Sequence, residues 1–592
     1  MCGFAAILSK RGKLVRVEQI EPLSAAMLER GPDGEGSWAS DCGTVVLAHR
    51  RLAIIDLSDR ARQPMHSESG KYTLVFNGEI YNFLELRDKL VSAGHRFRTG
   101  SDTEVILALF ECDGKSAFSQ LRGMFSLAIW NNETKELILA RDPFGIKPLY
   151  VGETADYFIV ASQVKSLLEF KELSREVDCA GIVGFYLFGS VPEPFTIFRE
   201  IRAFPPGHFL SLRPNSAFKE PTPFLTIPTL VRDIDPVSCS EPRSRFLEQV
   251  QDSALSHLVS DVPISLFLSA GVDSCALASI YRGRNVQAHT LSYEARSVVD
   301  EAEEAQRFSS GLGLAHRTHL ISDSDFTGSL EDILKAMDQP SIDGVNTYFV
   351  SRAASLAGAK VAISGLGGDE LLMGYNTFRR VKQLQRFKRL SRPWIGPLVR
   401  KLTARLFSLL GYPKHAGILE YSSDPASSYL LLRSLMMPWE LPAVLPLEVC
   451  REGLERLQVL ERLRSDISGI GPVERKVQVL ETCWYMRNQL LRDCDWASMA
   501  HSIELRVPLV DVRLFTSLAS RLPHEYANKS DLGIVAELPS YLLSRSKSGF
   551  SIPVQHWCKN LTTQPVGPTL RPGLRSWSRF VMTDYLDRYR GK

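Results

Sequence analysis

A proline-rich stretch, residues 213–242, divides this 592-residue sequence into two parts with different patterns. The stretch contains Pro214, Pro221, Pro223, Pro228, Pro236 and Pro242. Proline fixes the backbone φ angle and has no N–H donor, so prolines at this density cannot continue a helix or a central strand. We therefore interpret the stretch as a linker and expect two domains, one over residues 1–212 and one over residues 243–592.

The two parts predict different fold classes. Before the linker, short apolar runs bounded by Gly, Asp or Asn predict strands at 44–47, 72–76, 125–130 and 137–140. After the linker, buried strands at 264–268, 287–292 and 360–363 alternate with longer helical patterns, which is typical of an α/β domain with a parallel sheet. From residue 376 onward the pattern is mostly helical, so we expect helical additions to this domain.

Composition and charge exclude several classes of protein. No apolar run approaches the roughly 18 residues that a membrane span needs, so we expect no transmembrane segment. The apolar residues 3–8 are short and are followed by basic residues, unlike a secretory signal. The ten cysteines form no Cys-x-x-Cys pair, which argues against a zinc ribbon and a disulfide scaffold. A soluble, cytoplasmic, multidomain protein is the expectation.

One segment has a strong charge bias. Between Glu370 and Glu420 there is no acidic residue, whereas eleven Lys or Arg side chains occur over residues 379–414. One interpretation is a solvated helical face. The other is a surface for an anionic acceptor, a membrane headgroup layer or nucleic acid. The net charge of only +3 argues against nucleic acid as a partner.

Cys2 is the first candidate for catalysis. Removal of Met1 would leave Cys2 with a thiol and a free α-amine on the same carbon. An α-amine titrates near pH 7.7–8.0, so a useful fraction is unprotonated at neutral pH and accepts the thiol proton. Nucleophile and base would then belong to one residue, and no catalytic histidine is needed.

Five motifs follow Cys2 in order. They are residues 30–36 (RGPDGEG), 48–56 (AHRRLAIID), 76–82 (FNGEIYN), 101–104 (SDTE) and 141–150 (RDPFGIKPLY). Together they resemble the glutaminase domain of class II (N-terminal nucleophile) amidotransferases, over nearly the whole first domain. The resemblance implies an α+β fold of stacked antiparallel sheets with helices.

The same resemblance assigns roles in binding glutamine. Arg51 would bind the α-carboxylate of glutamine with its planar guanidinium, and Glu79 and Asp102 would bind the α-ammonium. Asn77 and the backbone N–H of Gly78 would donate hydrogen bonds to the oxyanion that forms when Cys2 attacks the amide. His49 has no required proton-transfer role, so we interpret it as a structural histidine.

The second candidate site begins at residues 263–274 (PISLFLSAGVDS), an apolar strand that runs into a turn of small residues. Small residues let backbone N–H groups approach a phosphate, and a helix can start directly afterwards. The sequence contains no Gly-x-x-x-x-Gly-Lys-Ser/Thr motif. The turn instead resembles the pyrophosphate loop of ATP pyrophosphatases, which transfer AMP and release pyrophosphate. ATP is therefore expected at Leu268, Ser269, Gly271, Asp273, Ser274, Ser364 and Gly365.

Later motifs extend this resemblance to the synthetase domain of asparagine synthetases. They are residues 361–370 (VAISGLGGDE), 498–508 (SMAHSIELRVP) and 545–550 (RSKSGF). Asp273 and Asp369 would meet a Mg²⁺ ion that bridges the triphosphate, and Lys547 would stabilise charge that develops on the phosphates. We interpret Glu504 and Arg506 as a structural ion pair at a helix end.

The two sites form one coherent reaction. Glutamine, ATP and R–COOH would give glutamate, AMP, pyrophosphate and R–CONH₂, because adenylation converts a carboxylate into a group that ammonia can attack. Ammonia released at Cys2 would stay neutral and nucleophilic in a dry passage between the domains. Motifs, order and length resemble the glutamine-hydrolysing asparagine synthetase family across nearly the whole chain.

The acceptor pocket departs from that family. Asparagine-forming members carry an acid within the turn as SGEGSD, where this sequence has SGLGGD with Leu366. Leucine cannot pair with an ammonium group, so a sugar uronic acid or a natural-product carboxylate is favoured over free aspartate. Asp343, Asn346 and Tyr348 are other candidate contacts to the acceptor.

Two further alternatives are a ring-forming synthetase that adenylates without glutamine and a non-catalytic relative. The intact set of Cys2, Arg51, Asn77 and Asp102 argues against both. A homodimer is one compatible assembly, although the sequence does not determine the oligomeric state.

Overall fold

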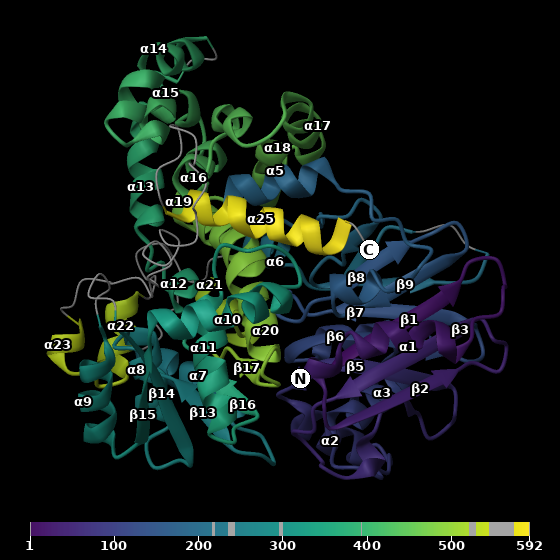
Figure 1. Ribbon diagram of the computed structural model, residues 1–592. Helices are drawn as coiled ribbons and strands as arrows, with labels where there is room; N and C mark the ends of the chain where they lie inside the picture. Colours follow the sequence, from purple (N-terminus) through teal and green to yellow (C-terminus); the bar gives the residue numbers. More distant parts are fainter. Residues whose placement is uncertain are drawn as a thin grey trace.

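The structure is a computed structural model that describes residues 2–215, 219–234, 243–294, 300–391, 394–519, 528–543 and 573–590. Within this part of the chain, two antiparallel sheets form the first domain and a parallel sheet with many helices forms the second (Figure 1). This arrangement confirms the predicted fold class.

The first antiparallel sheet is built around the amino-terminal strand. In spatial order its strands are β10 (Ile201–Ala203), β8 (Tyr150–Glu153), β9 (Tyr157–Ala161), β1 (Gly3–Ser9), β3 (Val45–Arg51) and β2 (Gly34–Ala39). The strand β1 therefore lies inside the sheet, paired antiparallel with both β3 and β9. This fixes the position of Cys2, the residue immediately before β1.

The second antiparallel sheet stacks on the first. Its order is β12 (Thr222–Pro223), β11 (His208–Leu212), β7 (Glu136–Arg141), β6 (Gly123–Asn131), β5 (Tyr72–Ile80) and β4 (Met65–His66). Alternate side chains of the two sheets, such as Phe4 and Trp130, form a fully buried cluster. The other face of the second sheet packs against α2 (Phe83–Ser92) and α3 (Asp102–Asp113), while α1 (Val17–Ala25) and α4 (Val164–Leu167) lie on the first sheet.

The second domain is built on a five-stranded parallel sheet. Its order is β15 (Ala315–Ile321), β14 (Val286–Tyr293), β13 (Ile264–Phe267), β16 (Val361–Ile363) and β17 (Glu504–Arg506). The connecting helices are α8 (Val272–Ile280), α9 (Ala302–Leu312), α10 (Asp323–Ala336) and α11 (Val345–Leu356). The chain order reverses between β13 and β16, and ligands bind at such a switch point beyond the carboxyl ends of the strands.

Helices account for most of the remaining chain. They are α5 (Cys179–Phe188), α7 (Arg243–Ser256), α12 (Gly368–Leu371), α13 (Asn376–Leu384), α14 (Ile395–Leu409), α15 (Ile418–Tyr421), α16 (Pro425–Arg433), α17 (Leu447–Leu457), α18 (Val459–Asp466), α19 (Val473–Leu480), α20 (Arg492–Met499), α21 (Val512–Ala519), α22 (Lys529–Val535), α23 (Ser540–Leu543) and α25 (Leu574–Arg590). A π-helical segment, Glu481–Leu491, joins α19 to α20. Such segments are frequent at functional sites, because the extra residue shifts the side chains that follow it.

Part of the predicted linker has regular structure. The strand β12 pairs with β11 at the edge of the second sheet, and α6 (Ile227–Asp233) follows it. Both elements accept proline for physical reasons. Pro223 lies on an edge strand, and Pro228 lies in the first turn of α6, where no helical hydrogen bond needs its N–H.

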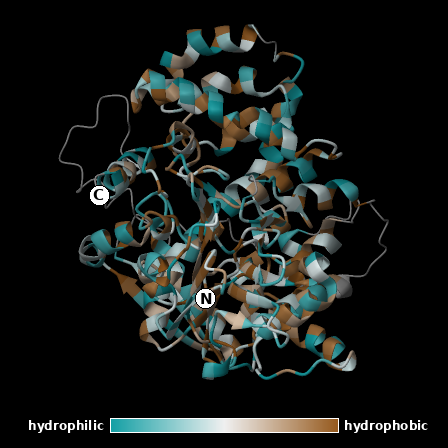
Figure 2. Ribbon diagram, turned by 90° about the vertical axis from the view of Figure 1, so that its right-hand side faces the viewer, coloured by the Kyte–Doolittle hydropathy of each residue, from teal (hydrophilic) through white to brown (hydrophobic). Residues whose placement is uncertain are grey.

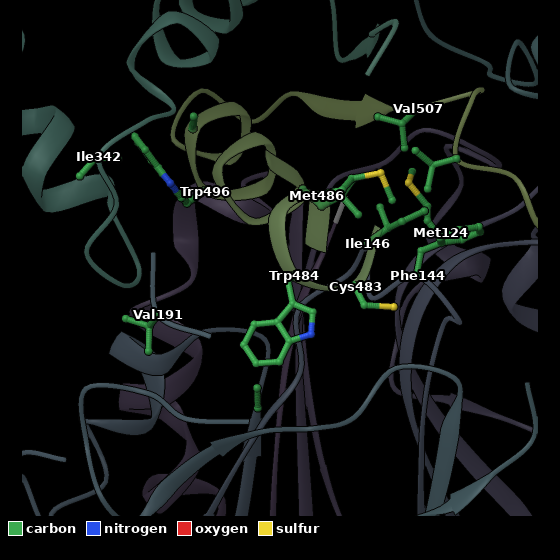
Figure 3. Close-up of a cluster of buried hydrophobic side chains, with 14 of the residues drawn as sticks. Met124, Phe144, Ile146, Val191, Ile342, Cys483, Trp484, Met486, Trp496 and Val507 are labelled. Atoms are coloured by element: carbon green, nitrogen blue, oxygen red, sulfur yellow. The ribbon is translucent and has the colours of Figure 1, made fainter. Parts of the chain in front are cut away.

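The two domains share one apolar core. Figure 3 shows Met124 and Phe144 of the first domain close to Met486 and Val507 of the second, within a single cluster of buried side chains. The ring of Phe144 also lies 5.6 Å from that of Phe515, edge to face. The interface therefore combines this apolar cluster with buried ion pairs, such as Arg30–Asp495 at 2.6 Å and Arg122–Asp511 at 2.7 Å. Over the described ranges, no helix has the length and apolar character that crossing a bilayer requires.

Candidate active site

The predicted glutamine-binding residues come together in the first domain. Cys2, Arg51, Gly78, Glu79 and Asp102 line one pocket of about 40 Å³. Cys2 precedes β1, Arg51 ends β3, Gly78 and Glu79 lie on β5, and Asp102 begins α3. Residues far apart in sequence thus meet where both sheets and one helix expose their ends.

Asn77 lies beside the candidate nucleophile. The backbone nitrogen of Cys2 donates a hydrogen bond to Asn77 Oδ1 at 3.2 Å. The Nδ2 group of Asn77 is buried and has no hydrogen-bond partner among the described residues. Burial raises the pKa of the Cys2 thiol, so a base is needed to form the thiolate. A buried donor without a partner, on a residue that contacts the Cys2 backbone, is available to an oxyanion that forms beside Cys2.

Arg51 is held in place by the backbone. Its Nη1 donates to the carbonyl oxygen of Ser58 at 2.9 Å, and its Nη2 donates to the carbonyl oxygen of Asp56. The Asp56 carboxylate in turn accepts a hydrogen bond from the N–H of Gly100 at 2.7 Å. These contacts fix the plane of the guanidinium at the pocket before any substrate arrives.

Two buried carboxylates face the pocket. Asp102 Oδ2 accepts a hydrogen bond from the N–H of Ile80 at 3.1 Å, and burial raises the pKa of Asp102 to about 6. Burial also raises the pKa of Glu79 well above its usual range. Glu79 Oε1 is buried without a hydrogen-bond partner in the described part of the chain. An ammonium group at this point would compensate both carboxylates.

Arg506, from the second domain, completes the pocket. Its Nη2 donates to Glu79 Oε2 at 2.9 Å, and its Nε donates to Glu504 Oε1 at 2.7 Å. Its Nη1 donates to the carbonyl oxygens of His257 and Val259 at 2.7 and 2.6 Å. Glu504 itself lines the glutamine pocket.

The expected ion pair of Glu504 and Arg506 is therefore present, but its predicted position at a helix end is wrong. Both residues lie on β17, where residues two apart share a face of the strand. The contact of Arg506 with Glu79, which joins residues 427 positions apart, was not predicted.

His49 lies on β3 and is fully buried. Its Nε2 lies 3.1 Å from the carbonyl oxygen of Phe76, and burial lowers the pKa of its ring to about 3. The ring is therefore neutral at physiological pH.

The predicted ATP-binding residues surround one cavity of about 340 Å³ in the second domain. The lining includes Leu268, Ser269, Gly271, Asp273, Ser274, Ser364 and Gly365. They follow the ends of β13 and β16, the two strands that flank the switch point of the sheet.

The turn after β13 is braced by its own hydroxyl groups. Ser274 Oγ donates to the carbonyl oxygen of Ser269 at 2.9 Å, and the N–H of Gly271 donates to Ser269 Oγ at 3.2 Å. The turn after β16 approaches it closely. A Cβ atom at Gly365 would lie 2.8 Å from the backbone nitrogen of Ser274, so a larger residue there would force the two turns apart.

Asp273 and Asp369 converge on one point. Lys529 Nζ, from α22, lies 2.5 Å from Asp273 Oδ2 and 2.6 Å from Asp369 Oδ1. A site where two carboxylates enclose one positive charge fits a divalent cation. In the described part of the chain no three His, Cys, Asp or Glu side chains form a metal cluster, so phosphate oxygens and water would supply the other ligands. Lys529 lies in no recognised motif and was not predicted.

Leu366, Asp343 and Asn346 line the same cavity, whereas Tyr348 does not. The ring of Tyr348 packs instead against His501, with ring centroids 4.3 Å apart. Asn346 and Tyr348 are two residues apart on α11, and side chains at that spacing point to different faces of a helix.

Asp493, on α20, is a second acid on the cavity wall and was also missed. It accepts hydrogen bonds from Ser341 Oγ at 2.7 Å and from Trp496 Nε1 at 2.8 Å. Burial and the nearby charge of Asp343 raise the pKa of Asp493 to about 8. Lys547 and the rest of residues 545–550 lie outside the described residues.

Comparison with known proteins accords with this geometry. The family model for the glutamine amidotransferase domain matches residues 1–222, and that for asparagine synthase matches residues 245–588. The chain is 31% identical to asparagine synthetase [glutamine-hydrolyzing] 1 of Bacillus subtilis, over 95% of this chain and 88% of that one. It is 32% identical to a putative asparagine synthetase [glutamine-hydrolyzing] of Mycobacterium tuberculosis, over 94% and 88%. It is 30% identical to amidase chry2 of Gibberella zeae, over 64% and 60%.

Proposed function

The chain belongs to the glutamine-hydrolysing asparagine synthetase family, and from this we propose that it amidates a carboxylate with nitrogen from glutamine at the cost of ATP. The products are glutamate, AMP, pyrophosphate and R–CONH₂. The observation that carries the proposal is the presence of two pockets on one chain, one around Cys2 and one around the turns after β13 and β16.

Glutamine hydrolysis takes place at Cys2. After removal of Met1, the free α-amine accepts the thiol proton, and the sulfur attacks the side-chain amide carbon. Arg51 binds the α-carboxylate, while Glu79 and Asp102 bind the α-ammonium. Asn77 Nδ2 and the N–H of Gly78 stabilise the oxyanion, and one such donor contributes about 2.7–4 kcal/mol to transition-state stabilisation. Collapse of the intermediate releases ammonia, and water then frees glutamate from the sulfur.

Acceptor activation takes place in the larger cavity. Backbone N–H groups of the turn 269–274 and the first turn of α8 bind the phosphates of ATP. The acceptor carboxylate attacks the α-phosphate, which forms the acyl adenylate and expels pyrophosphate. Asp273 and Asp369 would hold Mg²⁺, which neutralises phosphate charge when bound. Lys547 would add a positive charge beside the leaving pyrophosphate.

Ammonia crosses between the domains through the shared apolar core. A cluster that includes Met124, Phe144, Trp484 and Met486 lies at the interface (Figure 3). An apolar surrounding disfavours ammonium, so nitrogen that passes there stays neutral and keeps its lone pair.

The acceptor is a carboxylate that also carries an ammonium group. Asp343 and Asp493 both line the cavity, and their mutual repulsion is relieved when a cation binds between them. Leu366 offers no such partner, so the acidic contact would come from Asp343 and Asp493, which line the same cavity. A uronic acid lacks the ammonium group and would leave these acids uncompensated.

Free cysteines and the proposed use of ATP support a cytoplasmic location. The eight cysteines of the described residues are all free thiols. A homodimer is one compatible assembly.

Two measurements test the proposal. Cys2→Ala should abolish amide formation from glutamine while amide formation from added ammonia continues; loss of both would contradict the assigned role of Cys2. Pyrophosphate release should then be screened with aspartate, larger amino-bearing dicarboxylates and uronic acids. Turnover of uronic acids alone would refute the proposed acceptor class.

A further inference from the structure

Exposed apolar side chains are concentrated in one segment of the second domain. Of the twenty large hydrophobic side chains that are exposed among the described residues, nine lie between residues 387 and 412. They are Phe387, Leu390, Trp394, Leu398, Leu402, Leu406, Leu409, Leu410 and Tyr412. Single exposed leucines are ordinary on protein surfaces, but a contiguous group of this kind marks an interaction site.

The leucines of α14 form one face of the helix. Leu398, Leu402, Leu406 and Leu409 follow one another at spacings of three or four residues, so their side chains lie in one row. Their exposed fractions are 52%, 75%, 56% and 75%. A surface helix normally buries its apolar row against the protein, and α14 turns this row to solvent.

The opposite face of α14 attaches the helix to the protein. Arg400 Nε lies 2.5 Å from Glu420 Oε2, and the guanidinium of Arg400 stacks over the ring of Trp439 at 4.7 Å. The ring of Phe407 stacks on that of His415 at 6.1 Å. The leucine row is therefore not available to the rest of the chain as a packing surface.

Basic side chains border the leucine row. Lys401 and Arg405 are exposed on α14, and Arg386, Lys388 and Arg389 are exposed just before it. The sequence has no acidic residue from position 371 to position 419, so nothing on this segment offsets the charge. Leucines and a tryptophan flanked by Lys and Arg are the composition of helices that lie in the surface of a bilayer.

The helix is also placed for contact with a flat surface. Figure 1 shows α14 and α15 at the end of the helical region farthest from the three sheets. Figure 2, turned about the vertical axis, shows hydrophobic residues interspersed with hydrophilic ones on the helices at that end.

We propose that the exposed face of α14 binds the surface of an anionic lipid bilayer, with the leucine row among the acyl chains and the basic residues on the headgroups. A second copy of this chain fits less well. In a twofold dimer the same patch would meet itself and bring Lys401 and Arg405 against their own copies. The inference concerns where the enzyme acts, and it does not depend on which carboxylate is amidated.

The test is sedimentation of the full chain with vesicles, without substrates. We expect binding to vesicles that contain equal parts of phosphatidylcholine and phosphatidylglycerol, weak binding to phosphatidylcholine alone, and loss of binding at high salt. The double variant Leu402→Glu and Leu406→Glu should weaken binding at least about tenfold, which corresponds to about 1.4 kcal/mol. Lys401→Glu with Arg405→Glu should remove the preference for anionic vesicles.

Leu447→Glu is the matched control, because Leu447 is 69% exposed on α17 and lies outside the segment. It should bind like the wild type, and all variants should keep their melting temperature and ammonia-dependent activity. Equal binding to neutral vesicles, no binding, or binding unchanged in the leucine variant would overturn the proposal. A concentration-dependent dimer that the leucine variant dissociates would overturn it in favour of a second copy.

Discussion

Arg506→Lys should weaken glutamine binding without removing the synthetase reaction. Arg506 is fully buried and uses separate nitrogens for Glu504, for Glu79 and for two carbonyl oxygens. A lysine side chain has a single nitrogen and cannot make all of these hydrogen bonds at once. Because Glu504 lies on the same strand, we expect the lysine to stay with Glu504 and to leave Glu79 without its cation.

The size of the effect follows from the lost contact. A hydrogen bond to a charged group contributes about 1.5–3 kcal/mol, and each ~1.4 kcal/mol is a factor of ten, so KM for glutamine should rise about 10- to 100-fold. The positive charge of Arg506 also holds down the pKa of Glu79, which burial raises. Without that contact Glu79 binds a proton more readily, so the defect should be smaller at high pH and larger at low pH.

The assay measures glutamine-dependent and ammonia-dependent pyrophosphate release in one preparation, together with the melting temperature. Arg513→Lys is the matched control, because Arg513 pairs with Glu85 across the same two domains at 3.0 Å but is about half exposed. An exposed pair of this kind contributes ~1 kcal/mol or less. An unchanged KM for glutamine with a lowered melting temperature would show that Arg506 is only structural and would refute the reasoning.

Three further outcomes are expected. The kcat/KM for glutamine should rise with pH through about 6, because Asp102 must ionise to bind the ammonium, and Asp102→Asn should lower it at every pH. Lys529→Met removes the ammonium group that lies between Asp273 and Asp369, so Mg²⁺ should raise the melting temperature of the variant more than that of the wild type. Asp493 has a pKa of about 8, so KM for an amino-bearing acceptor should fall as pH rises through 8, and steady-state kinetics of Asp493→Asn should show a raised KM without that dependence.

Local sequence patterns predicted seven of the seventeen strands in the described residues. The prediction at 264–268 matches β13 (Ile264–Phe267), and the prediction at 360–363 matches β16 (Val361–Ile363). Each is a run of apolar residues with a turn signal at its end, which is information that the segment carries itself. The strand β17 has only three residues, and what makes it a strand is its pairing with β16. Nothing within residues 504–506 records that partner.

The site residues also divide into those that a local sequence pattern predicts and those that depend on tertiary packing. Motifs predicted the residues that surround Cys2 and the phosphate turns, because those residues lie in short segments with a recognisable order. Lys529 and Asp493 lie on helices whose sequences carry no sign of a ligand. They reach the cavity only because α22 and α20 pack beside it.

Strand β17 also contacts residues of both pockets. The carbonyl oxygen of Arg506 accepts a hydrogen bond from the N–H of Ser364 at 2.9 Å, and Ser364 begins the turn on the ATP cavity. The side chain of Arg506 meanwhile holds Glu79 in the glutamine pocket. Any shift of this turn would therefore be passed through β17 to a group that contacts the glutamine site.

Linkage gives this arrangement a measurable consequence. If ATP changes the affinity for glutamine by some factor, glutamine must change the affinity for ATP by the same factor. When that coupling passes through Arg506, it should disappear in Arg506→Lys and persist in Arg513→Lys. Equal coupling in both variants would show that the pockets communicate by another route, because only the first variant breaks the contact between β17 and Glu79.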